Sequence, residues 1–93
     1  MERAEAIERQ AVRLLSVVKY QIEATAKNGE KWQSPTIDQR EAKTNDRQFI
    51  YYCKTFLFVN PRYDNAKSIK IVKIYDYMNG EHIERETIYT EQR

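Results

Sequence analysis

Apolar residues recur at spacings of three and four over the first part of the chain, which is the pattern of one buried helical stripe. The stripe contains Ile7, Ala11, Leu14, Leu15, Val18 and Ile22. Asn28-Gly29 then provides a left-handed cap that ends a helix. The pattern therefore predicts one helix over residues 2–28, which at 1.5 Å per residue would be about 40 Å long.

A different pattern occupies the C-terminal part, where two β-type segments flank Asn79-Gly80. Asn-Gly favours a two-residue type I′ turn, because both central residues need a positive φ. The sequence thus predicts a hairpin with strands over residues 69–78 and 81–90. A turn at this dipeptide fixes the register. The expected opposite pairs are Tyr77 with His82, Tyr75 with Glu84, Lys73 with Glu86, Ile71 with Ile88, Met78 with Glu81, Asp76 with Ile83, Ile74 with Arg85 and Val72 with Thr87.

Residues 49–59 form the most apolar stretch, and alternate positions are apolar on both sides. A strand covered on both faces has this composition, so we predict a long strand here and a loop over residues 60–68. Residues 30–48 have few apolar residues, and we interpret them as a loop or a short helix beginning at Ser34-Pro35. Trp32 and Ile37 are the side chains expected to attach this segment to the rest.

These elements predict an α+β fold in one domain over residues 1–93. Its long N-terminal helix would pack on a three-stranded antiparallel meander, with a short helix or loop in the connection. The order of elements resembles the helix on a curved sheet of cystatin-like folds, and this resemblance implies no function. One helix can cover one face of such a sheet. We assign Val72, Ile74, Met78 and Ile83 to this covered face.

Composition adds little to this picture. The chain has 41% hydrophobic and 32% charged residues and a formal net charge of +2, which is typical of a globular domain and gives weak evidence for any one partner. No apolar run approaches the roughly 18 residues of a membrane span, and the first residues do not resemble a signal peptide. We therefore expect no membrane association and a cytoplasmic protein, which includes the cytoplasm of an infected host.

The sequence contains no convincing catalytic or metal-binding pattern. Cys53 and His82 are the only thiol and imidazole, and we interpret them as a buried side chain and a surface residue. With two glycines there is no glycine-rich phosphate loop. Asn60-Pro61-Arg62-Tyr63 matches a short turn motif that some phosphotyrosine-binding-type domains recognise, and a proline turn explains it equally well. We expect no enzyme activity, no metal and no small-molecule cofactor.

Tyrosine is the residue type that is concentrated, because six of the seven tyrosines follow residue 50 and are interleaved with lysines. Tyrosine suits protein interfaces, and an uncovered apolar sheet face usually marks one. We therefore predict a small non-enzymatic protein-binding module that acts as a homodimer, an inhibitor or an adaptor. Viral and mobile-element accessory or counter-defence factors are commonly of this kind. The predicted partner-binding residues are Tyr52, Lys54, Phe56, Lys73, Tyr75 and Tyr77.

The alternative is a protein that binds single-stranded RNA or DNA. The same tyrosines could stack on unpaired bases, and nearby basic residues could contact phosphates. Those phosphate contacts would come from Arg62, Lys67 and Lys70, together with Lys54 and Lys73. The nearly neutral total charge argues against this alternative.

Overall fold

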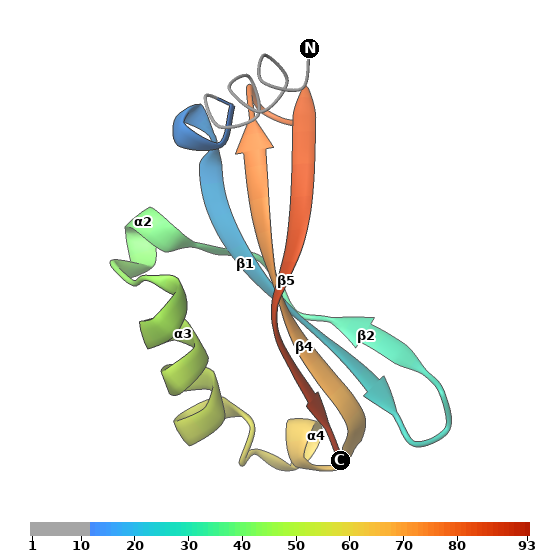
Figure 1. The fold of residues 1–93 in the computed structure, drawn as a ribbon. Helices are drawn as coiled ribbons and strands as arrows, with labels where there is room; N and C mark the ends of the chain where they lie inside the picture. Colours follow the sequence, from blue (N-terminus) through green and yellow to red (C-terminus); the bar gives the residue numbers. More distant parts are fainter. Residues whose placement is uncertain (1–11) are drawn as a thin grey trace.

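The structure is a computed structural model of the chain, and it describes residues 12–93. A helical turn at residues 12–15 precedes the first strand. Strands lie at both ends of the described part and short helices lie between them (Figure 1). The elements are β1 (Val17–Ala26), β2 (Lys31–Gln33), β3 (Ile37–Asp38), α2 (Gln39–Ala42), α3 (Asp46–Tyr52), the π-helix η1 (Cys53–Leu57), α4 (Pro61–Asp64), β4 (Ala66–Tyr77) and β5 (His82–Gln92).

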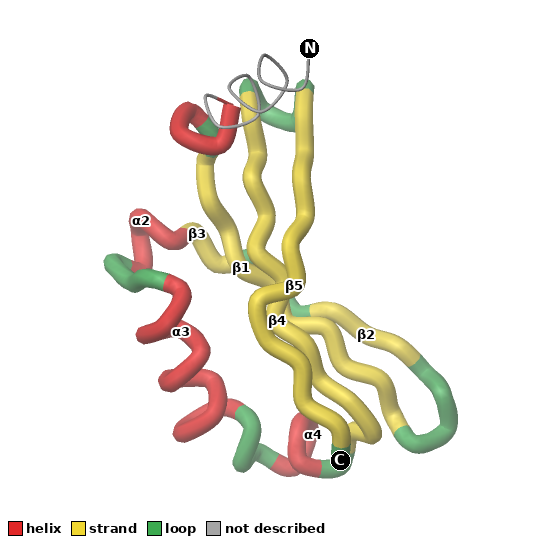
Figure 2. Tube along the Cα trace, in the orientation of Figure 1, coloured by secondary structure: helices red, strands yellow, loops and turns green. Residues whose placement is uncertain are grey.

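The strands form one five-stranded antiparallel sheet in the order β2-β1-β4-β5, and β3 also pairs with β1. The long strands β1, β4 and β5 twist strongly along their length, and the short helices lie to one side of them (Figure 2). The prediction of a three-stranded meander is therefore wrong in its number of strands, although the α+β class and the antiparallel sheet are confirmed.

The predicted N-terminal helix is also wrong. Residues 2–11 of that prediction lie outside the described residues, and residues 17–26 form β1, a central strand of the sheet. Tyr20, Ile22 and Ala24 are buried, whereas the residues between them are only partly so. A period of two therefore describes this segment better than the helical period that we fitted to it. The cystatin-like arrangement fails with it, because none of the helices in residues 12–93 is a long helix that crosses the sheet.

Residues 49–59 do not form the predicted strand. They belong to a helical arm, by which we mean the segment 39–64 that carries α2, α3, η1 and α4. Asn45 starts α3 with a capping box, in which its side chain accepts from the Gln48 backbone N–H while the Gln48 side chain accepts from the Asn45 N–H. These reciprocal bonds satisfy two donors that a helix start would otherwise leave unpaired. The helical cover of the sheet therefore comes from this arm.

The core lies between the arm and one face of the sheet. Phe49, Cys53 and Phe58 of the arm pack against this face. The strand residues that meet them are Tyr20, Ile22, Ala24, Ile69 and Ile71, and we call the face that they form the inner face. Val72 and Ile74 alternate with these residues in β4, so they belong to the outer face. The arm therefore covers the face opposite to the one that we assigned to a helix.

The predicted hairpin is confirmed. Glu81 N donates to Met78 O at 3.3 Å, and Asn79 and Gly80 have φ values of 52° and 93°, both positive as a type I′ turn requires. Six of the eight expected cross-strand pairs are present, from Tyr77–His82 to Val72–Thr87. Met78 and Glu81 do not pair in the sheet, because β4 ends at Tyr77 and β5 begins at His82. The Ile71–Ile88 pair is wrong because of a bulge, so that Ile71 lies opposite Tyr89. The bulge turns Tyr89 towards the core, where its ring lies 6.3 Å from that of Phe58.

The connection between β1 and the arm is more regular than expected. It contains β2 and β3, both paired with β1, and leads directly into α2, the first helix of the arm. Asp38, rather than Ser34, caps this helix by accepting from the Arg40 and Glu41 backbone N–H groups. Trp32 and Ile37 pack against the core, which confirms them as the attachment points of this segment.

Candidate partner-binding surface

The six predicted partner-binding residues lie on two different parts of the fold. Lys73, Tyr75 and Tyr77 are in β4, on the face that the arm covers, whereas Tyr52, Lys54 and Phe56 are in the arm itself. They therefore do not share one sheet face. Their role in partner binding stays a prediction, and their surroundings separate them into two groups.

Tyr75 is nearly buried, with 8% of its surface exposed. The Arg13 guanidinium lies 4.8 Å above its ring, and its hydroxyl donates to Glu86 Oε2 at 3.3 Å. Arg13 also pairs with Glu84 at 2.9 Å, and this hydrogen bond lowers the pKa of the Glu84 carboxyl. Tyr75 is therefore already engaged within the chain, and a partner could reach little of it.

Lys73 belongs to a polar network beneath the start of α3. Its ammonium donates to Asp46 Oδ2 at 3.0 Å, and the Tyr20 hydroxyl donates to Asp46 Oδ1 at 2.6 Å. Gln39 Nε2 donates in turn to the Tyr20 hydroxyl at 2.7 Å. Burial, followed by the Asp46 hydrogen bond, raises the pKa of Tyr20. Burial opposes the charged form of Lys73, but its hydrogen bond to Asp46 acts in the other direction and the pKa of Lys73 is raised. The network ties β1, β4 and the arm together.

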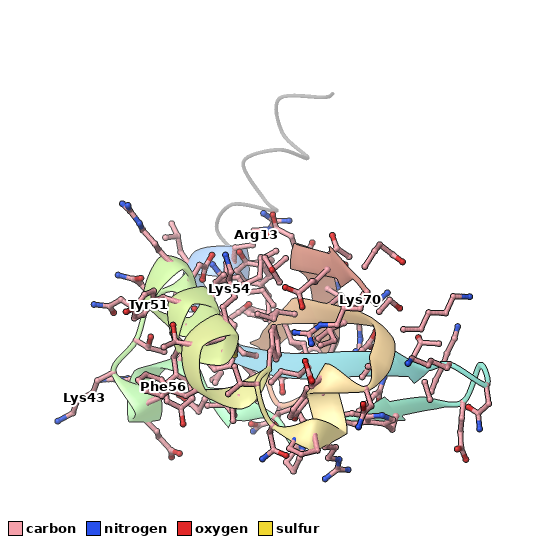
Figure 3. The ribbon with its side chains drawn as sticks, turned by 90° about the horizontal axis from the view of Figure 1, so that it is seen from below. Arg13, Lys43, Tyr51, Lys54, Phe56 and Lys70 are labelled. Atoms are coloured by element: carbon pink, nitrogen blue, oxygen red, sulfur yellow. The ribbon has the colours of Figure 1, made fainter. Side chains whose placement is uncertain are left out.

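The arm exposes large apolar side chains on its other side. Tyr51, Tyr52, Phe56 and Val59 are 67%, 49%, 61% and 67% exposed, and we call these four residues the aromatic helix face. The Tyr52 and Phe56 rings contact each other at 5.5 Å between centroids. Tyr51 and Phe56 lie on the side of the arm away from the sheet (Figure 3). The sequence reasoning found Tyr52 and Phe56 but missed Tyr51 and Val59, which a helical period over this segment would have included.

The π-helix explains why Phe56 is exposed. Phe58 N donates to Cys53 O, five residues back, at 2.8 Å. In an uninterrupted α-helix with Phe49 and Cys53 facing inward, Phe56 would be among the next inward residues. The wider turn instead buries Phe58 and leaves Phe56 beside Tyr52. Helix distortions of this kind are frequent at functional sites.

An open groove of about 550 Å³ borders Tyr52 at the junction of α2 and α3, and we call it the α2–α3 groove. Buried Phe49 contributes to its lining. Its remaining lining residues are Ile37, Ala42, Lys43, Thr44, Gln48 and Tyr52. A mainly apolar concavity with a few polar groups at its margin is the usual form of a binding pocket.

The basic residues predicted to contact phosphates do not line one groove. Lys70 pairs with Glu23 at 3.4 Å on the outer face, whereas Lys73 points to the inner face. The Arg62 guanidinium stacks on the Trp32 ring at 4.5 Å, and the Lys54 ammonium lies 5.7 Å from the Tyr89 ring. Lys67 is exposed at the start of β4. These placements disperse the charge that a phosphate track would concentrate.

Cys53 is fully buried in the core, and burial raises the pKa of its thiol to about 12. His82 starts β5 beside the hairpin turn and lies 3.4 Å from Glu84. Within residues 12–93 no group of three or more His, Cys, Asp or Glu side chains is placed to hold a metal ion. In the short motif, Asn60 caps α4 and Pro61 occupies its first turn, so the proline begins a helix rather than the β-turn that we expected.

Comparisons with protein-family models, with curated proteins and with solved structures found no match. None of the helices described in residues 12–93 is long and apolar enough to cross a membrane.

Proposed function

We propose that this chain is a small non-enzymatic protein-binding module that acts as an inhibitor or adaptor, and that the aromatic helix face is its contact surface. The observation that carries the proposal is the exposure of Tyr51, Tyr52, Phe56 and Val59 on one short segment. Exposed apolar patches of a few hundred Å² on a small protein usually mark interaction sites. Tyrosine and phenylalanine are also enriched at the centres of protein interfaces.

The backbone of this segment is suited to such a role. Its inner side packs on the sheet through Phe49, Cys53 and Phe58, so the exposed rings are held on a supported helix rather than on a loop. Rings that are fixed before binding lose little conformational entropy when a partner covers them. The proposal therefore keeps Tyr52 and Phe56 from the predicted site and replaces the sheet tyrosines with Tyr51 and Val59.

Binding of single-stranded RNA or DNA is the less supported alternative. Lys70 and Lys73 lie on opposite faces of the sheet, and each forms an ion pair within the chain. The assignment to viral or mobile-element accessory factors stays a prediction from composition.

The test compares two double variants in cells of the natural source. Tyr52→Ser with Phe56→Ser removes two rings from the aromatic helix face, and Val17→Ser with Ile83→Ser removes two half-exposed apolar side chains elsewhere. We expect a partner that is retained by the wild-type chain and the control. With purified components, the Tyr52/Phe56 variant should bind this partner about 30-fold more weakly. That factor corresponds to a loss of about 2 kcal/mol of binding free energy, as is typical for side chains at the centre of an interface.

The proposal is wrong if the partner is retained by the Tyr52/Phe56 variant and lost by the control. Light scattering on each purified protein adds a second readout. A dimer that dissociates in the Tyr52/Phe56 variant would identify the partner as a second copy of the chain, in place of a separate protein.

A further inference from the structure

The charges of the arm are unbalanced. Arg40, Lys43, Arg47 and Lys54 are exposed on the arm, and none of them forms an ion pair with another described residue. The arm's own acidic residues are largely engaged, because Asp46 pairs with Lys73 and Asp64 pairs with Arg93. Glu41 is then the one acidic residue of the arm without a partner among the described residues. The arm that carries the apolar rings therefore has a positive excess.

Lys43 lies at the margin of the α2–α3 groove and has an unusual backbone conformation. It ends α2 with φ 51° and ψ 48°, the left-handed region that favours glycine or asparagine. A long basic side chain is present here instead, and it projects from the arm on the side away from the sheet (Figure 3). Gln48 also lines this groove, and exposed Arg47 precedes it in the sequence.

From this juxtaposition, and resting on the proposed function, we infer that the α2–α3 groove binds an acidic peptide segment with one large apolar side chain. The apolar side chain enters the groove against Phe49 and Tyr52, and the flanking carboxylates face Lys43 and Arg47. An apolar anchor surrounded by complementary charges is a common form of peptide recognition.

The same charges argue against two other possible ligands of the groove, a second copy of the chain and a nucleic acid. A second copy docking through this surface would bring Lys43 and Arg47 near the equivalent residues of its partner, and juxtaposed like charges disfavour association. A nucleic acid carries a phosphate at every nucleotide and needs basic residues along a track. Here Lys43 is the one basic residue that lines the groove, and Glu41 lies between Arg40 and Lys43 in the sequence.

The test uses three probes with isotope-labelled protein: a short synthetic peptide of Glu and Asp around one central Phe, the same peptide with Ser for Phe, and a single-stranded oligothymidylate. Amide NMR shifts report binding even when it is weak. We expect the Phe peptide to shift the signals of Ala42, Thr44 and Gln48. The Ser peptide should bind at least about tenfold more weakly, and salt should weaken both by screening the flanking charges.

Two charge-reversed variants are compared. Lys43→Glu with Arg47→Glu should weaken the Phe peptide at least about tenfold. Lys31→Glu with Lys67→Glu makes the same charge change at two exposed sites outside the groove and should leave binding within about twofold. All four positions are exposed, so the far-ultraviolet circular dichroism and the melting temperature should be unchanged in both variants.

Three results would overturn the inference: tighter binding of the oligonucleotide than of the Phe peptide at the groove, equal binding of the Phe and Ser peptides, and equal weakening by the two charge-reversed variants. Lack of any shift with the Phe peptide would also overturn it. That failure would leave the proposed function intact if binding of a natural partner still depends on Tyr52 and Phe56. The two proposals are separable because the peptide titration tests the groove and the partner-retention experiment tests the aromatic helix face.

Discussion

Cys53 should make the stability of this protein fall steeply at alkaline pH. The side chain is fully buried beneath the arm, and burial raises the pKa of its thiol from 9.0 to about 12. Between these values the unfolded chain releases the thiol proton while the folded chain keeps it. Deprotonation therefore favours the unfolded state, so the contribution to stability is intact below about pH 8 and is lost as pH rises from about 9 towards 12.

The size of the effect follows from linkage. One proton difference changes the free energy of unfolding by about 1.4 kcal/mol per pH unit, which accumulates to a loss of about 2 kcal/mol at about pH 10.5. Tyr20, whose pKa is raised in the same direction by burial and then by its hydrogen bond to Asp46, adds to the loss above about pH 10. The comparison must therefore be made with a variant that lacks only the thiol.

The assay is urea unfolding followed by far-ultraviolet circular dichroism, at about pH 8 and about pH 10.5, for the wild type and Cys53→Ala under reducing conditions. The variant should lose about 2 kcal/mol less between the two pH values, whatever its stability at neutral pH. Parallel losses in the two proteins would refute the reasoning. They would mean that the thiol ionises equally in both states, and hence that the arm does not seal Cys53 against the sheet.

Three further predictions concern the contacts that hold the arm and the hairpin. Asp46→Ala should cost about 2–4 kcal/mol in urea unfolding, because the Tyr20 hydroxyl and the Lys73 ammonium both lose their acceptor; Asp46→Asn should cost less, since its amide oxygen can still accept one of these bonds. Gly80→Ala should lower stability by about 1 kcal/mol because φ at Gly80 is +93°, and Gly80→Asn should recover part of the loss. Removal of Arg93, which bonds Asp64, Glu91 and the Phe58 carbonyl, should lower the melting temperature by a few degrees and leave the circular dichroism spectrum unchanged.

The hairpin was predictable because its decisive signal is local. A positive φ at two successive residues is chemically demanding, and Asn79-Gly80 is the dipeptide that best satisfies it. The turn alone then fixes six cross-strand pairs. The register fails at Ile71, where the bulge begins, because a bulge depends on how the Tyr89 ring packs against Phe58 across the core.

The first strand could have been recognised, and the error there came from choosing between two periods. Val18 and Ile22 fit a helical stripe, but Tyr20 between them and Ala24 after them do not fit it and are buried. From Val18 to Thr25 apolar and polar residues alternate without exception, which is the period of a strand. The helical period was extended from Leu14 and Leu15 into a segment where it no longer applied.

The arm is harder to predict, because its residues 49–59 are apolar on both sides and no period distinguishes strand from helix there. The local evidence was the capping box at Asn45 and Gln48, and the Asn60-Pro61 start of α4. The π-helix has no such local signal. It follows from the need to bury Phe58 as well as Cys53, which is a property of the packed core.

The reasoning about surplus apolar surface still applies, but to a different element. The sequence has more apolar side chains after residue 48 than one covering helix could bury, and we assigned the excess to an open sheet face. The structure instead uses Phe49, Cys53 and Phe58 to cover that face, and a helix covering a sheet must direct its remaining side chains outward. Tyr51, Tyr52 and Phe56 are those side chains. The surplus apolar side chains therefore lie on the outer side of the arm and not on an open sheet face. For this reason two residues of the predicted site remain in the proposal, although the predicted strand does not exist.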